Sequence, residues 1–192
     1  MCGRYYIDDN DASEIRKILD ELDERHSVDV GEIYPTNIAP VICRSGVTAI
    51  KWGFPQWNSK GVIINARAET APEKAMFRKP LLEHRCVVPC SGYFEWQAVA
   101  GTKKKDKYLL NRPGDGILYL AGIYDVFRDA NGEYEAFVIL TTAANESVSH
   151  IHDRMPVIVT GDELEAWLED TRFTEHILKH AGPELMSAEY IA

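Results

Sequence analysis

The sequence has little positive charge, few cysteines and no long hydrophobic run. Lys and Arg number 21 against 30 Asp and Glu, which gives a net charge of −9. Proteins that coat nucleic acid are usually basic overall, so this balance argues against that class, although it does not exclude a local basic groove. No apolar run approaches the ~18 residues of a membrane helix, and the N-terminus lacks the basic-then-apolar pattern of a secretory signal. We therefore expect a cytoplasmic protein with no membrane partner.

Cysteine is too sparse and too irregularly spaced to indicate a structural zinc site. The four cysteines are Cys2, Cys43, Cys86 and Cys90. Cys86 and Cys90 lie close together, but no second pair completes a zinc set, so we expect them to be plain buried thiols. His150 and His152 would face the same side of a strand, yet they lack a third ligand. We expect neither a metal nor another cofactor.

Length and composition fit one globular domain. The chain has 192 residues, of which 45% are hydrophobic and 27% are charged. That length closes a core without disulfides or metals, and no fixed period indicates a repeat array. We expect a single domain over residues 2–192, because Met1 should be removed from the chain.

Most of the chain has the β-branched and aromatic composition of strands. The expected strands are 41–43, 47–50, 62–64, 86–96 with interruptions at Pro89 and Gly92, 107–110, 117–127, 134–142 and 155–159. Asn131-Gly132 predicts a hairpin turn, because both residues tolerate positive φ. Ser45-Gly46 is a second hairpin candidate.

Three capping signatures predict helices between or beside these strands. Each pairs an Asp or Thr with a Glu three residues later: Asp11 with Glu14, Thr70 with Glu73, and Thr160 with Glu163. Such a pair marks a helix start, and Pro80 should end or kink the second helix. The fold class is therefore α+β, a single domain with a largely antiparallel, barrel-like β-sheet core and peripheral helices.

Cys2 directly follows Met1, and its small side chain permits removal of that methionine. The mature chain would then begin with an α-amine of pKa ~7.7–8.0 and a thiol of pKa ~8.5 on adjacent carbons. An aldehyde forms a Schiff base with such an amine, and the thiol then closes a five-membered thiazolidine ring. No internal cysteine can do this. The alternative is that cysteine stands at position 2 by chance.

Six short blocks occur in order from Met1 to Pro156. They are Met1-Cys2-Gly3-Arg4-Tyr5, Tyr34-Pro35-Thr36-Asn37-Ile38-Ala39-Pro40, Trp52-Gly53-Phe54-Pro55, Asn65-Ala66-Arg67-Ala68-Glu69-Thr70, Gly92-Tyr93-Phe94-Glu95-Trp96 and Ile151-His152-Asp153-Arg154-Met155-Pro156. Together they resemble the SRAP (SOS response-associated peptidase) family from residue 2 to about residue 160. The resemblance implies an SRAP-like fold and covalent capture of abasic sites in single-stranded DNA through a thiazolidine on Cys2. The captured DNA would be protected, and the family's peptidase name reflects self-removal of residues before Cys2.

The resemblance also implies a catalytic set of Cys2, Asn65, Glu95 and His152. Asn65 would hydrogen-bond near the Cys2 amine and the sugar without adding charge. Glu95 would act as the general acid and base, and His152 would assist sugar ring opening and bond reversal. A strand-end asparagine that satisfies backbone groups and a solvated strand glutamate are the alternatives for Asn65 and Glu95.

A further set of residues is implied to bind DNA. It consists of Arg4, Asn37, Pro40, Trp52, Trp57 and Arg67. The two arginines would hold phosphates, unless either pairs with Glu69. Pro40 and the two tryptophans of this set would form an apolar shelf or wedge beside an unpaired base, where stacking is worth roughly 1–3 kcal/mol per base. A buried core position is the alternative for the tryptophans. The run 103–107, rich in lysine, is expected in a loop, either as a solvated turn or as an auxiliary DNA contact.

Three functions remain open on the sequence alone. The first is a crosslink-forming protein with lyase-like or self-processing activity, acting as a monomer on single-stranded DNA that contains abasic sites. The second is an N-terminal-cysteine amidohydrolase or peptidase, in which the α-amine serves as base for the thiol. The third is a non-covalent reader of modified or single-stranded DNA, which would keep its binding when Cys2 is removed.

Overall fold

The computed structural model describes residues 2–10, 14–22, 27–56, 59–112, 116–179 and 182–189. Its elements, in chain order, are β1 (Tyr5–Ile7), α1 (Glu14–Asp20), β2 (Gly31–Ile33), β3 (Ile38–Cys43), β4 (Gly46–Trp52), β5 (Phe54–Pro55), β6 (Val62–Ile63), β7 (Asn65–Arg67), α2 (Ala75–Glu83), β8 (Arg85–Cys90), β9 (Gly92–Ala98), β10 (Lys105–Asn111), β11 (Leu118–Asp129), β12 (Gly132–Ala143), α3 (Glu146–Ser149), β13 (Arg154–Pro156), β14 (Ile158–Val159), the 3₁₀ helix η1 (Gly161–Glu163), α4 (Leu164–Glu169), α5 (Thr174–Leu178) and β15 (Met186–Glu189). Strands dominate and the helices are short, so the α+β prediction is confirmed.

Five strands close into a barrel. They pair in the order β12-β4-β3-β8-β11, and the pairing of β11 with β12 completes the ring. Only the contact between β4 and β12 is parallel within this ring; the other four are antiparallel. Closure satisfies the edges of the sheet, which would otherwise expose unpaired backbone groups. The prediction of a largely antiparallel, barrel-like core is therefore confirmed.

Both faces of the barrel strands are buried, in two separate apolar clusters. In β8, Cys86 and Val88 belong to the first cluster, while Val87 between them belongs to the second. This alternation follows from the two-residue period of a strand. Trp167 of α4 lies in the second cluster and Ile15 of α1 in the first, so helices pack against both clusters.

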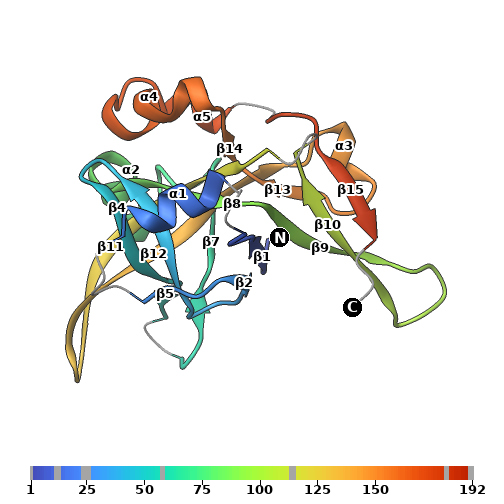
Figure 1. Cartoon of the computed structure of the whole chain (residues 1–192), viewed down its shortest axis with the longest axis horizontal. Coiled ribbons are helices and arrows are strands. Elements are labelled where there is room, and N and C mark those ends of the chain that lie inside the picture. The colour runs from blue at the N-terminus through green and yellow to red at the C-terminus, as the bar shows by residue number, and fades with distance from the viewer. Residues whose placement is uncertain are drawn as a thin grey trace.

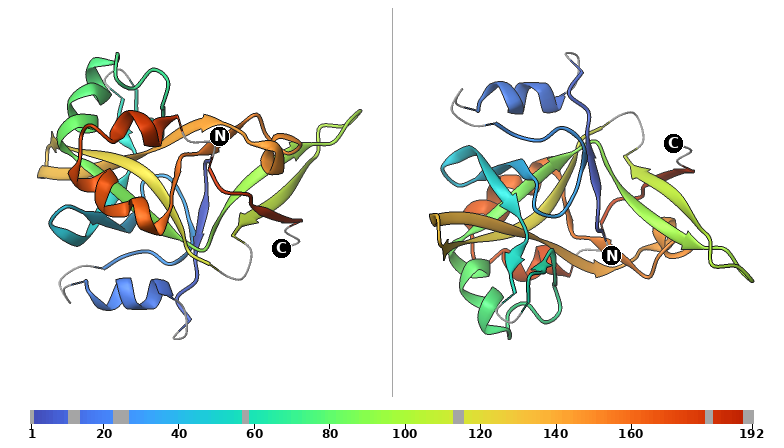
Figure 2. Two further views of the ribbon diagram at one scale, coloured as in Figure 1. Left: turned by 90° about the horizontal axis from the view of Figure 1, so that it is seen from above. Right: turned by 90° about the horizontal axis from the view of Figure 1, so that it is seen from below.

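A second sheet carries the strands that follow the N-terminus. Its order is β15-β10-β9-β1-β2. Figure 1 and both views of Figure 2 show β1 running through the middle of the molecule, between the barrel and the long β9–β10 hairpin. The chain passes from the barrel strand β8 to β9 of the second sheet at Ser91. The expected strand 86–96 is thus two strands in different sheets, and Pro89 lies within β8 opposite Tyr119 without interrupting it.

The hairpin between β11 and β12 was predicted one residue too late. Asp129 pairs with Gly132, so the two turn residues are Ala130 and Asn131. Gly132 has φ 122° and supplies the positive φ that the tight connection requires. The hairpin between β3 and β4 shows the same shift, because Cys43 pairs with Gly46.

The capping signatures had different outcomes. The Thr160–Glu163 capping box is confirmed at η1, where the Glu163 carboxylate accepts bonds from both the backbone and the hydroxyl of Thr160. Thr70 instead closes a turn, and α2 begins only at Ala75. Pro80 does not end that helix, which continues to Glu83; its ring is buried. α1 forms as predicted, while Asp11 lies outside the described residues.

Two further expectations need correction. The strand expected over 155–159 is interrupted at Val157, which separates β13 from β14. The run 103–107 is only partly a loop, because its last three residues begin β10. Within the described ranges, no helix is long and apolar enough to cross a membrane.

Candidate active site

Cys2 and Asn65 are in direct contact although 63 positions separate them. Nδ2 of Asn65 donates to the carbonyl oxygen of Cys2 at 2.9 Å. Asn65 is the first residue of β7, which pairs in parallel with β12 and is therefore fixed by the barrel. Its Oδ1 is buried and has no hydrogen-bond partner among the described residues. The amide nitrogen of Asn65 therefore binds the Cys2 backbone, while its oxygen can still accept a hydrogen bond.

In the full chain, in which Met1 still precedes it, Cys2 is fully buried. Its thiol makes a weak bond to the carbonyl oxygen of Arg4 at 3.8 Å. Burial foremost, and then the charge of Glu95, raises the pKa of Cys2 well above its ordinary value. The thiol is consequently protonated at neutral pH, and Glu95 lies within electrostatic reach of it.

Glu95 and His152 form a carboxyl–imidazole pair. Glu95 lies in β9 and is 2% exposed, and its Oε2 is 4.0 Å from Nε2 of His152. Nδ1 of His152 accepts the Arg154 backbone N–H at 3.0 Å, so in the neutral ring the proton is on Nε2, facing Glu95. The carboxylate of Asp153 lies 2.9 Å from the same Nδ1 and matches the protonated ring instead. The pair can thus exchange a proton with a group placed beside Glu95.

His150 and His152 do not share a strand. His150 caps the C-terminal end of α3, and His152 follows in the turn before β13. The structure thus brings the four implied catalytic residues together: Asn65 touches Cys2, Glu95 acts on the Cys2 thiol, and His152 adjoins Glu95. Their chemical roles remain predictions.

Arg4 belongs to a different cluster. Its guanidinium pairs with Glu32 at 3.1 Å and lies over the rings of Tyr34 and Trp96, at 4.2 and 5.2 Å from their centres. Trp96 adjoins Glu95 along β9, so their side chains leave opposite faces of the sheet. Arg4 is therefore held on the face away from Glu95. Glu32, which also pairs with Lys107 at 2.6 Å, was not foreseen, since no local pattern links these distant residues.

Glu69 forms an ion pair with Arg154, a partner that no sequence pattern indicated. Two guanidinium nitrogens of Arg154 donate to the Glu69 carboxylate, at 2.6 and 2.9 Å. The hydrogen bond from Arg154 is the main reason that the pKa of Glu69 is lowered. The alternative in which Arg4 pairs with Glu69 is wrong, because Arg4 pairs with Glu32. Arg67 is exposed, and it lies two residues after Asn65 on β7, on the same face of that strand. An exposed cation thus lies beside the Cys2–Asn65 contact.

Two of the expected DNA contacts are buried in the core. Trp52 is fully buried, donates its indole N–H to the Ile64 carbonyl at 3.1 Å and packs against Tyr5 at 5.0 Å between ring centres. Pro40 is buried within β3. Neither can stack on a base, because barrel closure covers them; the core alternative is right for Trp52, and Pro40 is no wedge.

Asn37 shapes its own loop, and Trp57 lies outside the described residues. Oδ1 of Asn37 accepts a hydrogen bond from the Tyr34 backbone N–H at 2.7 Å. The backbone carbonyl of Asn37 accepts one from the Trp52 backbone N–H at 2.9 Å. These bonds tie the loop to the end of β4. Thr36, at φ 78°, completes the turn.

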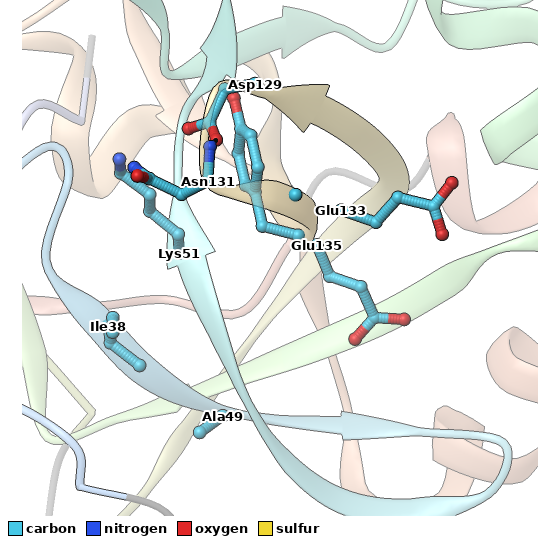
Figure 3. Close-up of a pocket in the computed structure, with 9 residues that line it drawn as sticks. Ile38, Ala49, Lys51, Asp129, Asn131, Glu133 and Glu135 are labelled. Carbon is cyan, nitrogen blue, oxygen red and sulfur yellow. Dashed lines mark hydrogen bonds between the residues drawn. The ribbon is translucent and has the colours of Figure 1, made fainter.

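No metal centre is formed in the part of the chain that the structure describes. Cys86 and Cys90 are free and buried, as expected of plain thiols. A cavity of about 340 Å³ opens elsewhere, beside β4 and the β11–β12 hairpin. Figure 3 shows Glu133 and Glu135 pointing to one side of it and Lys51 to the other. Its acidic lining disfavours a phosphate backbone, and none of the implied catalytic residues reaches it.

Comparison with known proteins gave consistent matches. A family model described as "SOS response associated peptidase (SRAP)" matches residues 1–190. The abasic site processing protein YoqW of Bacillus subtilis is 33% identical over 212 aligned positions, covering 100% of this chain and 92% of YoqW. The abasic site processing protein YedK of Escherichia coli is 30% identical, covering 88% of this chain and 79% of YedK.

Solved structures match the fold over nearly the whole chain. A protein from Bacteroides thetaiotaomicron has a TM-score of 0.79 at 26% identity, covering 98% of this chain and 91% of its own. A protein from Bordetella bronchiseptica has a TM-score of 0.83 at 22% identity, covering 100% of both chains. The second likeness concerns the fold alone.

Proposed function

This chain belongs to the SOS response associated peptidase (SRAP) family, and from that premise we propose that it captures abasic sites in single-stranded DNA as a covalent adduct on Cys2. The names of the relatives, abasic site processing proteins, support the substrate. The observation that carries the proposal is the Asn65 amide bound to Cys2, beside the buried Glu95 carboxyl and its His152 partner. That arrangement supplies an orienting group and a proton carrier at a residue that becomes a free terminus once Met1 is removed, by an aminopeptidase or by the chain itself.

The amine acts first in this mechanism. An abasic sugar in its open form carries an aldehyde at C1′, and the neutral Cys2 amine attacks that carbon. The carbonyl oxygen receives one proton from the amine and a second from the Glu95–His152 pair, and it leaves as water. Asn65 Oδ1, buried and without a described partner, is free to accept an N–H of the amine and orient its lone pair. An iminium ion joined to the DNA results.

The thiol then closes the ring. Its sulfur attacks C1′, the iminium electron pair returns to nitrogen, and the S–H proton returns to the Glu95–His152 pair. The raised pKa of Cys2 means that the thiol needs a base at this step, and Glu95 is the carboxylate within electrostatic reach. Aldehyde and aminothiol thus give a thiazolidine and one water, with no change of oxidation state.

Non-covalent affinity for DNA can be modest, because the bond provides retention. The net charge of −9 repels a polyanion. Arg67, two residues after Asn65 on β7, is an exposed cation that could offset this repulsion near Cys2. Single-stranded DNA fits better than a duplex, because the buried Cys2 requires a sugar that can leave the stack.

The test compares three proteins on a single-stranded oligonucleotide with one abasic site. Wild type should give a slowly migrating band that survives denaturation, and Cys2→Ala should give none. Cys43→Ala, which removes a buried cysteine of β3 away from Asn65 and Glu95, should retain the band. Equal bands from wild type and Cys2→Ala would contradict the proposal.

A further inference from the structure

Two fully buried tyrosine hydroxyls lie without a partner near the terminus. Tyr5 and Tyr93 are each 0% exposed, and neither phenolic oxygen has a hydrogen-bond partner among the described residues. The two residues face each other across β1 and β9. Buried hydroxyls are normally paired, and leaving one unpaired destabilises the folded state. The presence of each unpaired hydroxyl is therefore not explained by the stability of the fold.

Tyr93 is directed to the candidate active site. It precedes Glu95 by two positions in β9, and the pairing with β10 is regular from Tyr93 through Glu95, so both side chains lie on one face. Tyr93 and Cys2 belong to the same buried cluster. Burial first, then the charges of Cys2 and Glu95, raises the pKa of Tyr93 well above its ordinary value. The hydroxyl is thus within range of both groups and remains an O–H donor at neutral pH.

Tyr5 lies in a different setting on the same sheet. Its ring packs against Trp52 of the barrel. Burial first, then the charges of Cys90 and Cys2, raises its pKa, and Glu95 is not among the causes. Tyr5 therefore differs from Tyr93 in lying against the barrel core and outside the influence of Glu95, and it serves as the control for loss of a buried hydroxyl.

We propose that Tyr93 is a further catalytic residue, whose hydroxyl donates a hydrogen bond to the C1′ oxygen of the abasic aldehyde while that oxygen leaves as water. This inference rests on the proposed function. The N–C1′ bond forms, the C1′–O bond breaks, and both protons of the departing water come from the amine and the Glu95–His152 pair. Tyr93 keeps its own proton and stabilises the negative charge that develops on the oxygen. Its unpaired hydroxyl in the absence of substrate is what such a preorganised donor requires.

The test is Tyr93→Phe, with Tyr5→Phe as the control. Both variants remove one unpaired oxygen and keep the ring, so each should melt at or above the wild-type temperature. With excess protein over an abasic oligonucleotide, the maximal crosslinking rate of Tyr93→Phe should fall by about tenfold or more, while the protein concentration giving half that rate stays unchanged. Tyr5→Phe should crosslink within about twofold of wild type, since it keeps the buried ring and removes a hydroxyl that takes no part in the reaction.

Each outcome decides the point. A wild-type rate in Tyr93→Phe overturns the inference and leaves the proposed function standing, whereas absence of a crosslink in wild type overturns the proposed function itself. Equal slowing of both variants also overturns the inference, because it indicates a packing effect. If Tyr93→Phe fails to fold, 3-fluorotyrosine at position 93 replaces it: a changed rate supports the inference, because the donor is more acidic, and an unchanged rate overturns it.

Discussion

At the scale of single residues, the meaning of Asn65 depends on one contact. A strand-end asparagine commonly satisfies nearby backbone groups, and Asn65 does satisfy a backbone group, but that group is the Cys2 carbonyl. The structural and the functional interpretations of this side chain therefore coincide. Glu95 differs, because its 2% exposure excludes the solvated strand glutamate that the sequence left open.

Replacing Asn65 tests the contact directly. Asn65→Asp should slow crosslinking about tenfold or more, because the donor to the Cys2 carbonyl is lost and a second carboxylate is introduced near Glu95. The rate is measured with the abasic oligonucleotide, and folding is checked by thermal melting. Asn131→Asp makes the same chemical change in the β11–β12 turn and should leave the rate unchanged. A wild-type rate in Asn65→Asp would remove the orienting role.

The ion pairs of Glu32 should make part of the folding stability depend on pH. Burial raises its pKa, but bonds from Lys107 and Tyr34 and the charge of Arg4 outweigh burial, so the pKa is lowered overall. A lowered pKa in the folded state stabilises the protein above the pKa of the unfolded chain, near 4.3, and this stabilisation is lost as pH falls through the folded value. Glu32→Gln should therefore lower the free energy of unfolding by about 1 kcal/mol at neutral pH, with a smaller difference below about pH 4.

Urea unfolding at several pH values measures this difference. Glu73→Gln, at an exposed position in the turn before α2, is the matched control and should show no such pH dependence. A stability difference for Glu32→Gln that does not change with pH would contradict the role of the ion pairs.

At the scale of elements, local signals predicted what local bonds determine. The capping box at Thr160 and the β11–β12 hairpin depend on neighbouring residues and were found from the sequence, the hairpin with its turn one residue too late. The start of α2 was not, because the turn at Thr70 is fixed by backbone hydrogen bonds that Thr70 and Ala71 donate to the Arg67 carbonyl at the end of β7. Nor could the transfer of the chain between two sheets at Ser91 be predicted, since both segments have the same strand composition.

Two glycines test the backbone requirement of the hairpin. A Cβ at Gly132 or Gly161 would meet no atom within 4 Å, but only Gly132 has a positive φ, at 122°. Gly132→Ala should therefore lower the free energy of unfolding by about 1–2 kcal/mol through backbone strain alone. Gly161→Ala should be neutral within about 0.5 kcal/mol or slightly stabilising. Equal effects in urea unfolding would show that φ at position 132 is not the cause.

At the scale of the whole molecule, the sequence predicted the barrel and a set of residues that the structure brings together, but not the surroundings of that set. Ordered motifs indicated Cys2, Asn65, Glu95 and His152, whose meeting depends on barrel closure. The burial of Trp52 could not be read from its neighbours, because both a core and a surface tryptophan fit the same pattern. The partners of Arg4 and Glu69 are Glu32 and Arg154, which lie far away in the sequence, so no local pattern could indicate these ion pairs.

The charge of the whole chain gives a prediction for DNA binding. The logarithm of the binding constant of the Cys2→Ala variant for single-stranded DNA should fall linearly with the logarithm of salt concentration, with a slope of ~0.7 per phosphate neutralised. Arg67→Ala in that background should reduce the slope by about 0.7. Arg128→Ala should leave the slope unchanged, because Arg128 pairs with Glu133 in the β11–β12 hairpin. An unchanged slope for Arg67→Ala, measured by fluorescence anisotropy, would exclude that phosphate contact.

The most direct test of the central claim is the intact mass of the protein before and after exposure to an abasic oligonucleotide. Before exposure, we predict the mass of the chain without Met1. Afterwards, we predict the sum of that mass and the oligonucleotide less one water, unchanged by borohydride, which would reduce a Schiff base but not a thiazolidine. Retention of Met1 on a protein that still forms the adduct, or an adduct that maps to any residue other than Cys2, would contradict the account.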